Sequence, residues 1–136
     1  MMRILIADDD PVGIEVNKRL IYSYVNFNSI NNAYIKTVSN GYEAVDSFRE
    51  SLIAREPFDL IMLDRGMPCF NGEYALNKIR QLEQRSNYRV KPCHIIIVTS
   101  RSPSGDILTI SNHCDSYLLK PISVPAIYKI LANQTE

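Results

Sequence analysis

The chain has 136 residues, a length typical of one domain, and 46 % of them are hydrophobic, which is enough for a sizeable core. Lysine and arginine together number 15, as do aspartate and glutamate, so the formal net charge is zero and argues against direct binding to nucleic acid or to a membrane. Because no apolar run approaches a membrane span, no signal peptide precedes the first strand and the three cysteines lack a metal or redox spacing, we expect one cytoplasmic domain over residues 1–136.

A short apolar run near the start of the chain, Ile4–Ala7, predicts a first strand, and three aspartates follow it, Asp8, Asp9 and Asp10. Pro11 suits the first turn of a helix for which Asp10 is the cap. In this helix an apolar residue recurs at every fourth position, and we expect the stripe to face the core. The stripe consists of Val12, Val16, Leu20 and Tyr24.

An edge strand, a second helix and a central strand are predicted next. Residues 33–38 mix apolar and polar side chains, as edge strands do. The apolar stripe of the helix that follows consists of Ala44, Val45, Phe48 and Leu52. Leu60–Leu63 is a continuous apolar run, typical of a strand buried on both faces, and it leads directly into Asp64. Gly66 and Pro68 then end the regular structure.

The second half of the chain continues the alternation of helices and strands. A third helix has its apolar residues at Ala75, Leu76, Ile79 and Leu82. The buried strand Ile95–Val98 leads into Thr99, and a weakly patterned helix is expected over 104–113. Tyr117–Leu119 is the fifth strand, which ends at Lys120. A last helix, capped by a serine, has its buried side at Ile127, Ile130 and Leu131.

Strands thus alternate with helices five times, a pattern typical of a parallel sheet with helices on both faces. We therefore expect an α/β fold, a doubly wound five-stranded parallel sheet with five helices. In such a sheet the carboxyl ends of all strands lie at one edge, where open α/β sheets bind their ligands.

Polar side chains follow four of the five strands, and we expect them to meet at this edge. They are Asp8 and Asp9 after the first strand, Asp64 after the third, Thr99 after the fourth and Lys120 after the fifth. Clustered carboxylates repel one another unless a cation offsets them, and oxygen ligands favour a hard divalent ion, above all Mg²⁺. The set contains a carboxylate nucleophile, a metal site and donors for phosphoryl oxygens, as phosphoryl transfer to a carboxylate requires. Each residue alone is as well explained as a cap, a strand end or a surface charge, so the indication comes from their convergence.

Several motifs occur together along the chain. They are Asp8-Asp9 after the first strand, Asn40-Gly41-x-Glu43-Ala44, Leu63-Asp64-x-x-Met67-Pro68-x-x-Asn71-Gly72, Thr99 after the fourth strand, and Tyr117-x-x-Lys120-Pro121. With this combination the chain resembles, over nearly its whole length, the response-regulator receiver domains of two-component signalling. The resemblance implies a flavodoxin-like sheet with strand order 2-1-3-4-5. Asp10-Pro11-Val12 and the charged tail of the third helix look more like receivers of hybrid sensor kinases than like those of DNA-binding regulators.

The resemblance implies that Asp64 accepts a phosphoryl group from a histidine of a histidine kinase or a histidine phosphotransfer protein, with Mg²⁺ as cofactor. Asp9 and Asp64 would be the direct side-chain ligands of the metal ion. Asp8 would act mostly through water, and the Gly66 carbonyl would complete the protein's ligands. A domain of this kind is a phosphoacceptor rather than an enzyme, although it assists its own phosphorylation and its slow dephosphorylation.

By the same resemblance, Thr99 and Tyr117 would form a switch pair that changes the surface for partner binding after phosphorylation. The chain departs from the family pattern at Gly66, which has no side chain to contact a phosphoryl group or an attacking water, and at Arg101 near the mouth of the site. These departures put the dephosphorylation rate in question. The sequence identifies neither the kinase nor the output partner, and it does not set the oligomeric state.

Two other functions compete with this interpretation. A haloacid-dehalogenase-type phosphatase would also use an aspartate nucleophile and Mg²⁺, but such enzymes carry a second acid two residues after the nucleophile, where this chain has Gly66. A degenerate receiver that acts only as a docking module would not need the acidic residues, Thr99 and Lys120, all of which are present. A dinucleotide-binding enzyme is disfavoured because no glycine-rich G-x-G-x-x-G motif follows the first strand.

Overall fold

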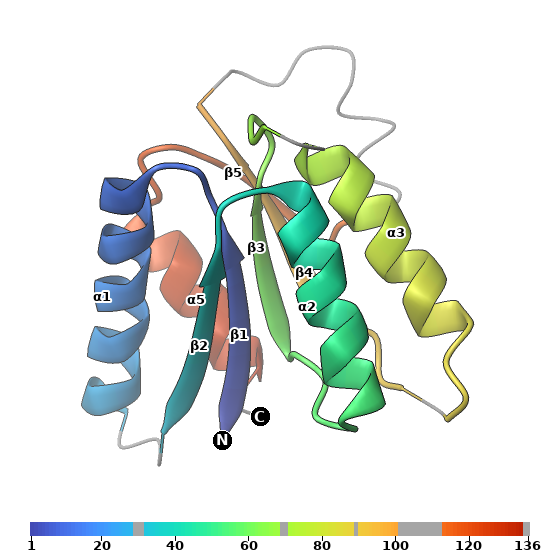
Figure 1. Ribbon diagram of the computed structural model, residues 1–136. Coiled ribbons are helices and arrows are strands. Elements are labelled where there is room, and N and C mark those ends of the chain that lie inside the picture. Colours follow the sequence, from blue (N-terminus) through green and yellow to red (C-terminus); the bar gives the residue numbers. More distant parts are fainter. Residues whose placement is uncertain (29–31, 69–70, 89, 101–112, 135–136) are drawn as a thin grey trace.

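The computed structural model describes residues 1–28, 32–68, 71–88, 90–100 and 113–134, and within them it contains five strands and four α-helices (Figure 1). The strands form one parallel sheet in the order β2-β1-β3-β4-β5, as the sequence predicts. Their bounds are Met2–Ala7 for β1, Ala33–Val38 for β2, Leu60–Asp64 for β3, His94–Thr99 for β4 and Ser116–Leu119 for β5. The helices are α1 Pro11–Phe27, α2 Gly41–Ile53, α3 Gly72–Gln84 and α5 Val124–Gln134. The helix expected over 104–113 lies, but for its last residue, outside the described residues.

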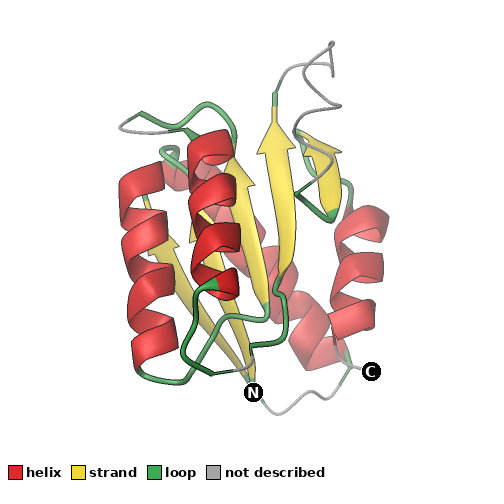
Figure 2. Cartoon of the chain, turned by 90° about the vertical axis from the view of Figure 1, so that its right-hand side faces the viewer, coloured by secondary structure: helices red, strands yellow, loops and turns green. Residues whose placement is uncertain are grey.

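Helices cover both faces of the sheet, with α1 and α5 on one face and α2 and α3 on the other (Figures 1 and 2). Side chains alternate along each central strand, so that Ile4 and Ile6 of β1 pack towards α1 and α5 while Leu5 packs towards α2 and α3. The strands β1, β3 and β4 are therefore buried on both faces. This double burial explains the continuous apolar runs of the sequence.

Three of the four helices bury the residues that their sequence pattern predicts. The buried predicted residues are Ala44, Val45, Phe48 and Leu52 in α2, Ala75, Leu76 and Ile79 in α3, and Ile127, Ile130 and Leu131 in α5. Leu82, the last residue of the α3 stripe, is only partly buried against the same core. Among the described helices, none combines the length and the apolar character needed to cross a membrane.

The prediction for α1 was partly wrong. Val12 is 70 % exposed and Val16 is 51 % exposed, whereas Ile21, Tyr24 and Val25 are buried. An α-helix advances about 100° per residue, so a stripe at every fourth position drifts by about 40° per step. The stripe that starts at Val12 therefore turns onto the buried face only towards the end of the helix. It leaves two exposed valines beside the carboxyl edge of the sheet.

A polar network that the sequence did not predict lies at the opposite end of the sheet, where β4 and β5 begin. The Arg80 guanidinium of α3 donates hydrogen bonds to the Cys93 carbonyl at 3.0 Å and the His113 carbonyl at 2.8 Å, and it pairs with Asp115 at 2.8 Å. Asp115 also accepts from the Ile95 backbone N–H at 2.8 Å. The network ties α3 to the starts of β4 and β5.

Candidate functional site

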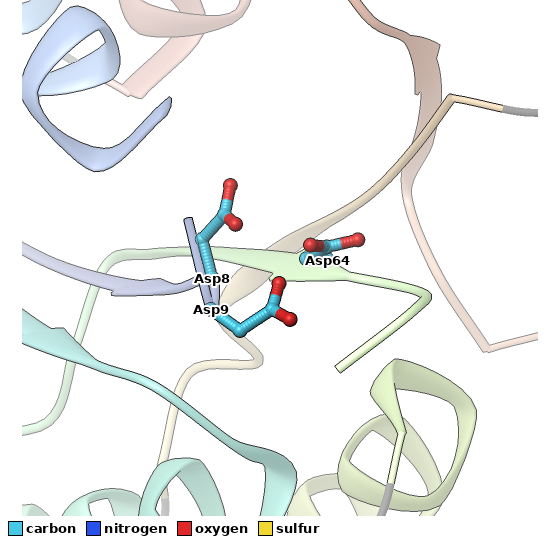
Figure 3. A group of neighbouring side chains, drawn as sticks. All are labelled: Asp8, Asp9 and Asp64. Atoms are coloured by element: carbon cyan, nitrogen blue, oxygen red, sulfur yellow. The ribbon is translucent and has the colours of Figure 1, made fainter. Parts of the chain in front are cut away.

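The three predicted acidic residues meet at the carboxyl edge of the sheet. Asp8 and Asp9 follow β1, and Asp64 is the last residue of β3, one strand away. Figure 3 shows the three side chains gathered around one space, and a carboxylate oxygen from each lies within 4.8 Å of the others. Asp8 is 2 % exposed and Asp64 is 9 % exposed, while Asp9 is open to solvent. The cluster therefore combines two buried acids with one that is accessible.

Lys120 bridges the two buried acids. Its Nζ lies 3.1 Å from Asp8 Oδ2 and 3.3 Å from Asp64 Oδ2. Burial raises the pKa of Asp8, and the hydrogen bonds that it accepts from the Asp10 backbone and from Lys120 offset this only in part. Burial of the ammonium opposes its ionisation, but the hydrogen bond to Asp8 and the charge of Asp64 outweigh this effect and raise the pKa of Lys120. The geometry thus brings Asp8, Asp64 and Lys120 into direct contact.

Backbone N–H groups orient both buried carboxylates. The Asp10 N–H donates to Asp8 Oδ1 at 2.9 Å, and the Gly66 N–H donates to Asp64 Oδ1 at 3.0 Å. Asp10 also caps α1 by accepting from the Val12 N–H at 3.1 Å, as predicted. The turns that leave β1 and β3 thus hold one oxygen of each acid and direct the other towards Lys120.

Two glycines make room for this arrangement, and sequence analysis did not assign them this role. A Cβ added at Gly13 would lie 3.1 Å from Asp8 Oδ2, and a Cβ added at Gly72 would lie 2.7 Å from the Asp64 carbonyl oxygen. Gly72 therefore lets the first turn of α3 approach the end of β3 more closely than any side chain would permit. The Asn-Gly pair at the start of α3 is a signal in the sequence that indicates such an approach.

The donor set fits a hard divalent cation. Three carboxylates face a single ammonium, so the charges of these four side chains sum to −3 + 1 = −2. Two of the acids are buried, where unbalanced like charges are costly. Carboxylate and carbonyl oxygens are the ligands that Mg²⁺ prefers in proteins. The residues present therefore suit Mg²⁺, as the sequence predicted.

A pocket of about 370 Å³ opens beside Asp64. Its wall includes Arg65, Gly66, Glu73 and Thr99. Thr99 ends β4 and is 4 % exposed, and its carbonyl accepts from the Lys120 N–H at 2.8 Å, which joins the ends of β4 and β5. Thr99 thus borders the space beside Asp64, where the sequence placed it. Sequence analysis missed Arg65 and Glu73, which are eight positions apart and share no motif.

Tyr117 packs on the face of the sheet covered by α2 and α3, while its neighbour Leu118 packs towards α1 and α5. The alternation of side chains along β5 therefore places Tyr117 and Leu118 on opposite faces of the sheet. Its hydroxyl is buried, and among the described residues it has no hydrogen-bond partner.

A family model described as the response regulator receiver domain matches residues 4–132 of this chain. The sensor histidine kinase GacS of Pseudomonas protegens is 29 % identical over 134 residues, which make up 98 % of this chain and 13 % of that protein. The hybrid signal transduction histidine kinase I of Dictyostelium discoideum is 26 % identical over 133 residues, which make up 97 % of this chain and 7 % of that protein. The chain thus spans only a small part of the length of these relatives.

Solved structures with similar folds include two from signalling proteins. A mutant of the receiver domain of the histidine kinase CKI1 from Arabidopsis thaliana has a TM-score of 0.74 at 24 % identity, covering 96 % of this chain and 89 % of that chain. A chain of the CheX-CheY-BeF3-Mg complex from Borrelia burgdorferi has a TM-score of 0.77 at 16 % identity, covering 99 % and 90 %. These similarities establish the CheY-like, flavodoxin-type architecture of the chain.

Proposed function

Because this chain belongs to the family of response regulator receiver domains, which are signalling domains of two-component systems, we propose that Asp64 accepts a phosphoryl group from a phosphohistidine donor in a Mg²⁺-dependent reaction. The observation that carries the proposal is the placement of the Lys120 ammonium within 3.1 Å of Asp8 and 3.3 Å of Asp64, beside an open pocket. Phosphoryl transfer to a carboxylate needs a nucleophile, neutralisation of the developing charge, and donors for the phosphoryl oxygens. The predicted residues can supply all three.

In the proposed reaction, a carboxylate oxygen of Asp64 attacks the phosphorus of the phosphohistidine. A P–O bond forms and the P–N bond breaks, and its electron pair stays on the imidazole, which takes up a proton. Lys120 and the Thr99 hydroxyl donate hydrogen bonds to phosphoryl oxygens. Asp9, Asp64 and the Gly66 carbonyl would hold Mg²⁺, with Asp8 acting through water, and the bound ion would neutralise charge on the transferring group.

The acceptor assignment is tested by labelling with phosphoramidate in the presence and absence of Mg²⁺. We expect Mg²⁺-dependent, hydroxylamine-labile phosphorylation that is lost in Asp64→Asn. The matched control is Asp46→Asn, because Asp46 is a half-exposed acid on α2 whose ion pair with Arg49, at 3.4 Å, is open to solvent. Labelling of Asp64→Asn at the wild-type level would exclude this acceptor. Steady turnover of phosphate esters would instead favour a phosphatase.

We further propose that Thr99 and Tyr117 form the switch. Thr99 borders the pocket beside Asp64, and the buried Tyr117 hydroxyl without a partner among the described residues supports a ring with a second position. Phosphorylation would draw Thr99 towards the phosphoryl group and let the Tyr117 ring move. The equilibrium between the two positions of the ring would then shift towards the second one. NMR spectra with and without beryllofluoride test this idea. Shifts confined to the surroundings of Asp64, with Tyr117 unmoved, would contradict it.

We infer that residues 1–136 act as one receiver domain in the cytoplasm. Cys93 and Cys114 are free thiols, which fits a reducing compartment. The donor would be a histidine kinase or a histidine phosphotransfer protein, in keeping with the histidine kinases among the relatives. Trapping of the phosphorylated donor with Asp64→Asn would identify it.

A further inference from the structure

Gly66 leaves a gap in the wall of the pocket beside Asp64. A Cβ added at this position would meet only Asp64 Oδ1, at 3.8 Å, which is ordinary contact. Since Gly66 has no side chain, neighbouring residues must provide this part of the wall. The pocket is the space that a phosphoryl group on Asp64 and an attacking water would share.

Arg65 and Glu73 line the same pocket and are joined to each other. The Arg65 Nε donates to Glu73 Oε1 at 2.6 Å, a short charge-assisted hydrogen bond. The Arg65 side chain is 18 % exposed and the Glu73 side chain is 35 % exposed, so the pair is partly screened from solvent. Such a pair is held more firmly than most surface ion pairs.

The pair is not needed to bring α3 to the end of β3. Gly72 already packs against the Asp64 backbone, where a Cβ would be 2.7 Å from the carbonyl oxygen, and its N–H donates to the Arg65 carbonyl at 3.4 Å. Asn71 caps the helix by accepting from the Tyr74 N–H at 3.0 Å. The first turn of α3 is therefore fixed by the backbone and its cap. Glu73 is thereby placed where it can hold the Arg65 guanidinium against the pocket.

We propose that Arg65 and Glu73 form a positioning pair that lengthens the lifetime of the phosphoryl group on Asp64, an inference that rests on the proposed function. In hydrolysis, the oxygen of a water forms a new P–O bond, the P–O bond to Asp64 breaks, and the carboxylate leaves with the electron pair while the proton of the water goes to solvent. Through its hydrogen bond, Glu73 holds the Arg65 guanidinium at the side of the pocket where Gly66 contributes no side chain. The held guanidinium restricts the approach of water to the phosphorus.

The test compares the wild type, Glu73→Ala, Arg65→Ala, the double variant and Glu73→Gln after phosphorylation by phosphoramidate and removal of the donor. We expect hydrolysis about three- to tenfold faster in each alanine variant, which corresponds to about 0.7–1.4 kcal/mol, the net contribution of an ordinary hydrogen bond in a partly exposed pair. The double variant should be no faster than the single ones, because the two residues act as a unit. Glu73→Gln keeps an acceptor for Arg65 Nε and should recover most of the lifetime.

A merely structural role would predict a different set of results. Wild-type lifetimes in both alanine variants, or multiplied effects in the double variant, would overturn the proposal. A longer lifetime in Glu73→Ala would also overturn it, because Glu73 would then be assisting the water. Beryllofluoride binding and the melting temperature should stay close to wild type in all variants. If the alanine variants lost beryllofluoride binding and melted at a lower temperature, and Glu73→Gln did not recover either property, the pair would only support the fold.

The same experiment separates this inference from the proposed function. If the wild type takes up no hydroxylamine-labile phosphate and forms no beryllofluoride adduct, the acceptor role of Asp64 fails, and the lifetime inference fails with it. If the wild type is phosphorylated and the variants hydrolyse at the same rate, only the inference fails.

Discussion

Gly72 shows how a single residue can decide the geometry of the crevice. Its position at the start of α3 is favourable for alanine by helix propensity, since alanine is the better helix former. The structure opposes this preference, because an added Cβ would lie 2.7 Å from the Asp64 carbonyl oxygen and 3.2 Å from Arg65 Cα. Both contacts are with backbone atoms, which cannot turn away as a flexible side chain could.

We predict that Gly72→Ala lowers the free energy of unfolding by about 1–3 kcal/mol, the usual cost of forcing extra volume into a packed site. Urea denaturation measures the effect. Gly66→Ala is the matched control, because the same methyl group there meets only Asp64 Oδ1 at 3.8 Å. Equal stabilities of the two variants would mean that α3 does not rest on the end of β3 as described.

His94 provides a residue-scale prediction about pH. It begins β4, and its Nε2 lies 2.9 Å from the Ser116 hydroxyl of β5. Burial lowers the pKa of His94 below its usual value, despite the opposing charge of Asp115. The unfolded chain then binds the proton more readily than the folded one, so this contribution to stability is present above about pH 6.5 and is lost as the pH falls through the lowered value.

We therefore expect the wild type to lose more stability than His94→Gln between pH 7.5 and about pH 5, measured by urea denaturation at each pH. His113→Gln is the control, because the His113 side chain is exposed. If the wild type and His94→Gln had the same pH dependence, protonation of His94 would not be coupled to unfolding.

At the scale of elements, α1 differs most from its predicted orientation. The helix turns Ile21, Tyr24 and Val25 into the core and leaves Val12 and Val16 at its first turns exposed to solvent. These valines lie in the first two turns after the Asp10 cap, at the end of α1 that is near the acidic cluster. A protein that delivers a phosphoryl group to Asp64 must pass close to this end of α1.

We predict that replacing Val12 and Val16 together by serine slows phosphotransfer from a phosphorylated histidine phosphotransfer domain about tenfold, as loss of two apolar interface contacts would. The rate with phosphoramidate should not change, because this small donor needs no docking surface. Ile53→Ser is the control, since Ile53 is 78 % exposed at the far end of α2. Equal slowing with both donors would place the effect in the chemistry rather than in docking.

At the scale of the whole molecule, the parallel sheet explains why one site gathers residues so distant in sequence. Asp8 and Lys120 are 112 positions apart, yet they meet because both follow strands that end at the same edge. This convergence concentrates negative charge in a buried crevice. Among the described residues, Lys120 alone pairs with the buried acids and offsets that charge. The fold and the cation are therefore expected to stabilise each other.

We predict that Mg²⁺ raises the melting temperature through a single weak site. At ten times the dissociation constant, the gain in the free energy of unfolding is about 1.4 kcal/mol. Asp9→Ala should abolish this response while folding normally, because Asp9 is exposed. Asp46→Ala is the control for a general effect of charge. An undiminished response in Asp9→Ala would place the metal elsewhere.

The sequence was sufficient for the central strands and the acidic residues at their ends, and its resemblance to receiver domains for the strand order. Strands buried on both faces have continuous apolar runs, and Asp8, Asp64 and Thr99 follow such runs directly, so local patterns locate them. The conformation of the chain around each of these residues depends mainly on its near neighbours. The same is true of the caps, which are set by short-range hydrogen bonds such as that between Asp10 and the Val12 N–H.

Only the tertiary structure decided which face of α1 is buried, on which side of the sheet Tyr117 lies, and how Arg65 and Glu73 meet. Arg80 and Asp115 are another example, since they are 35 positions apart and no local pattern joins them. Such contacts depend on how helices pack on the sheet, which local periodicity does not specify. An exposed valine and a buried one look alike in sequence, and the distinction arises from the close packing of the folded chain.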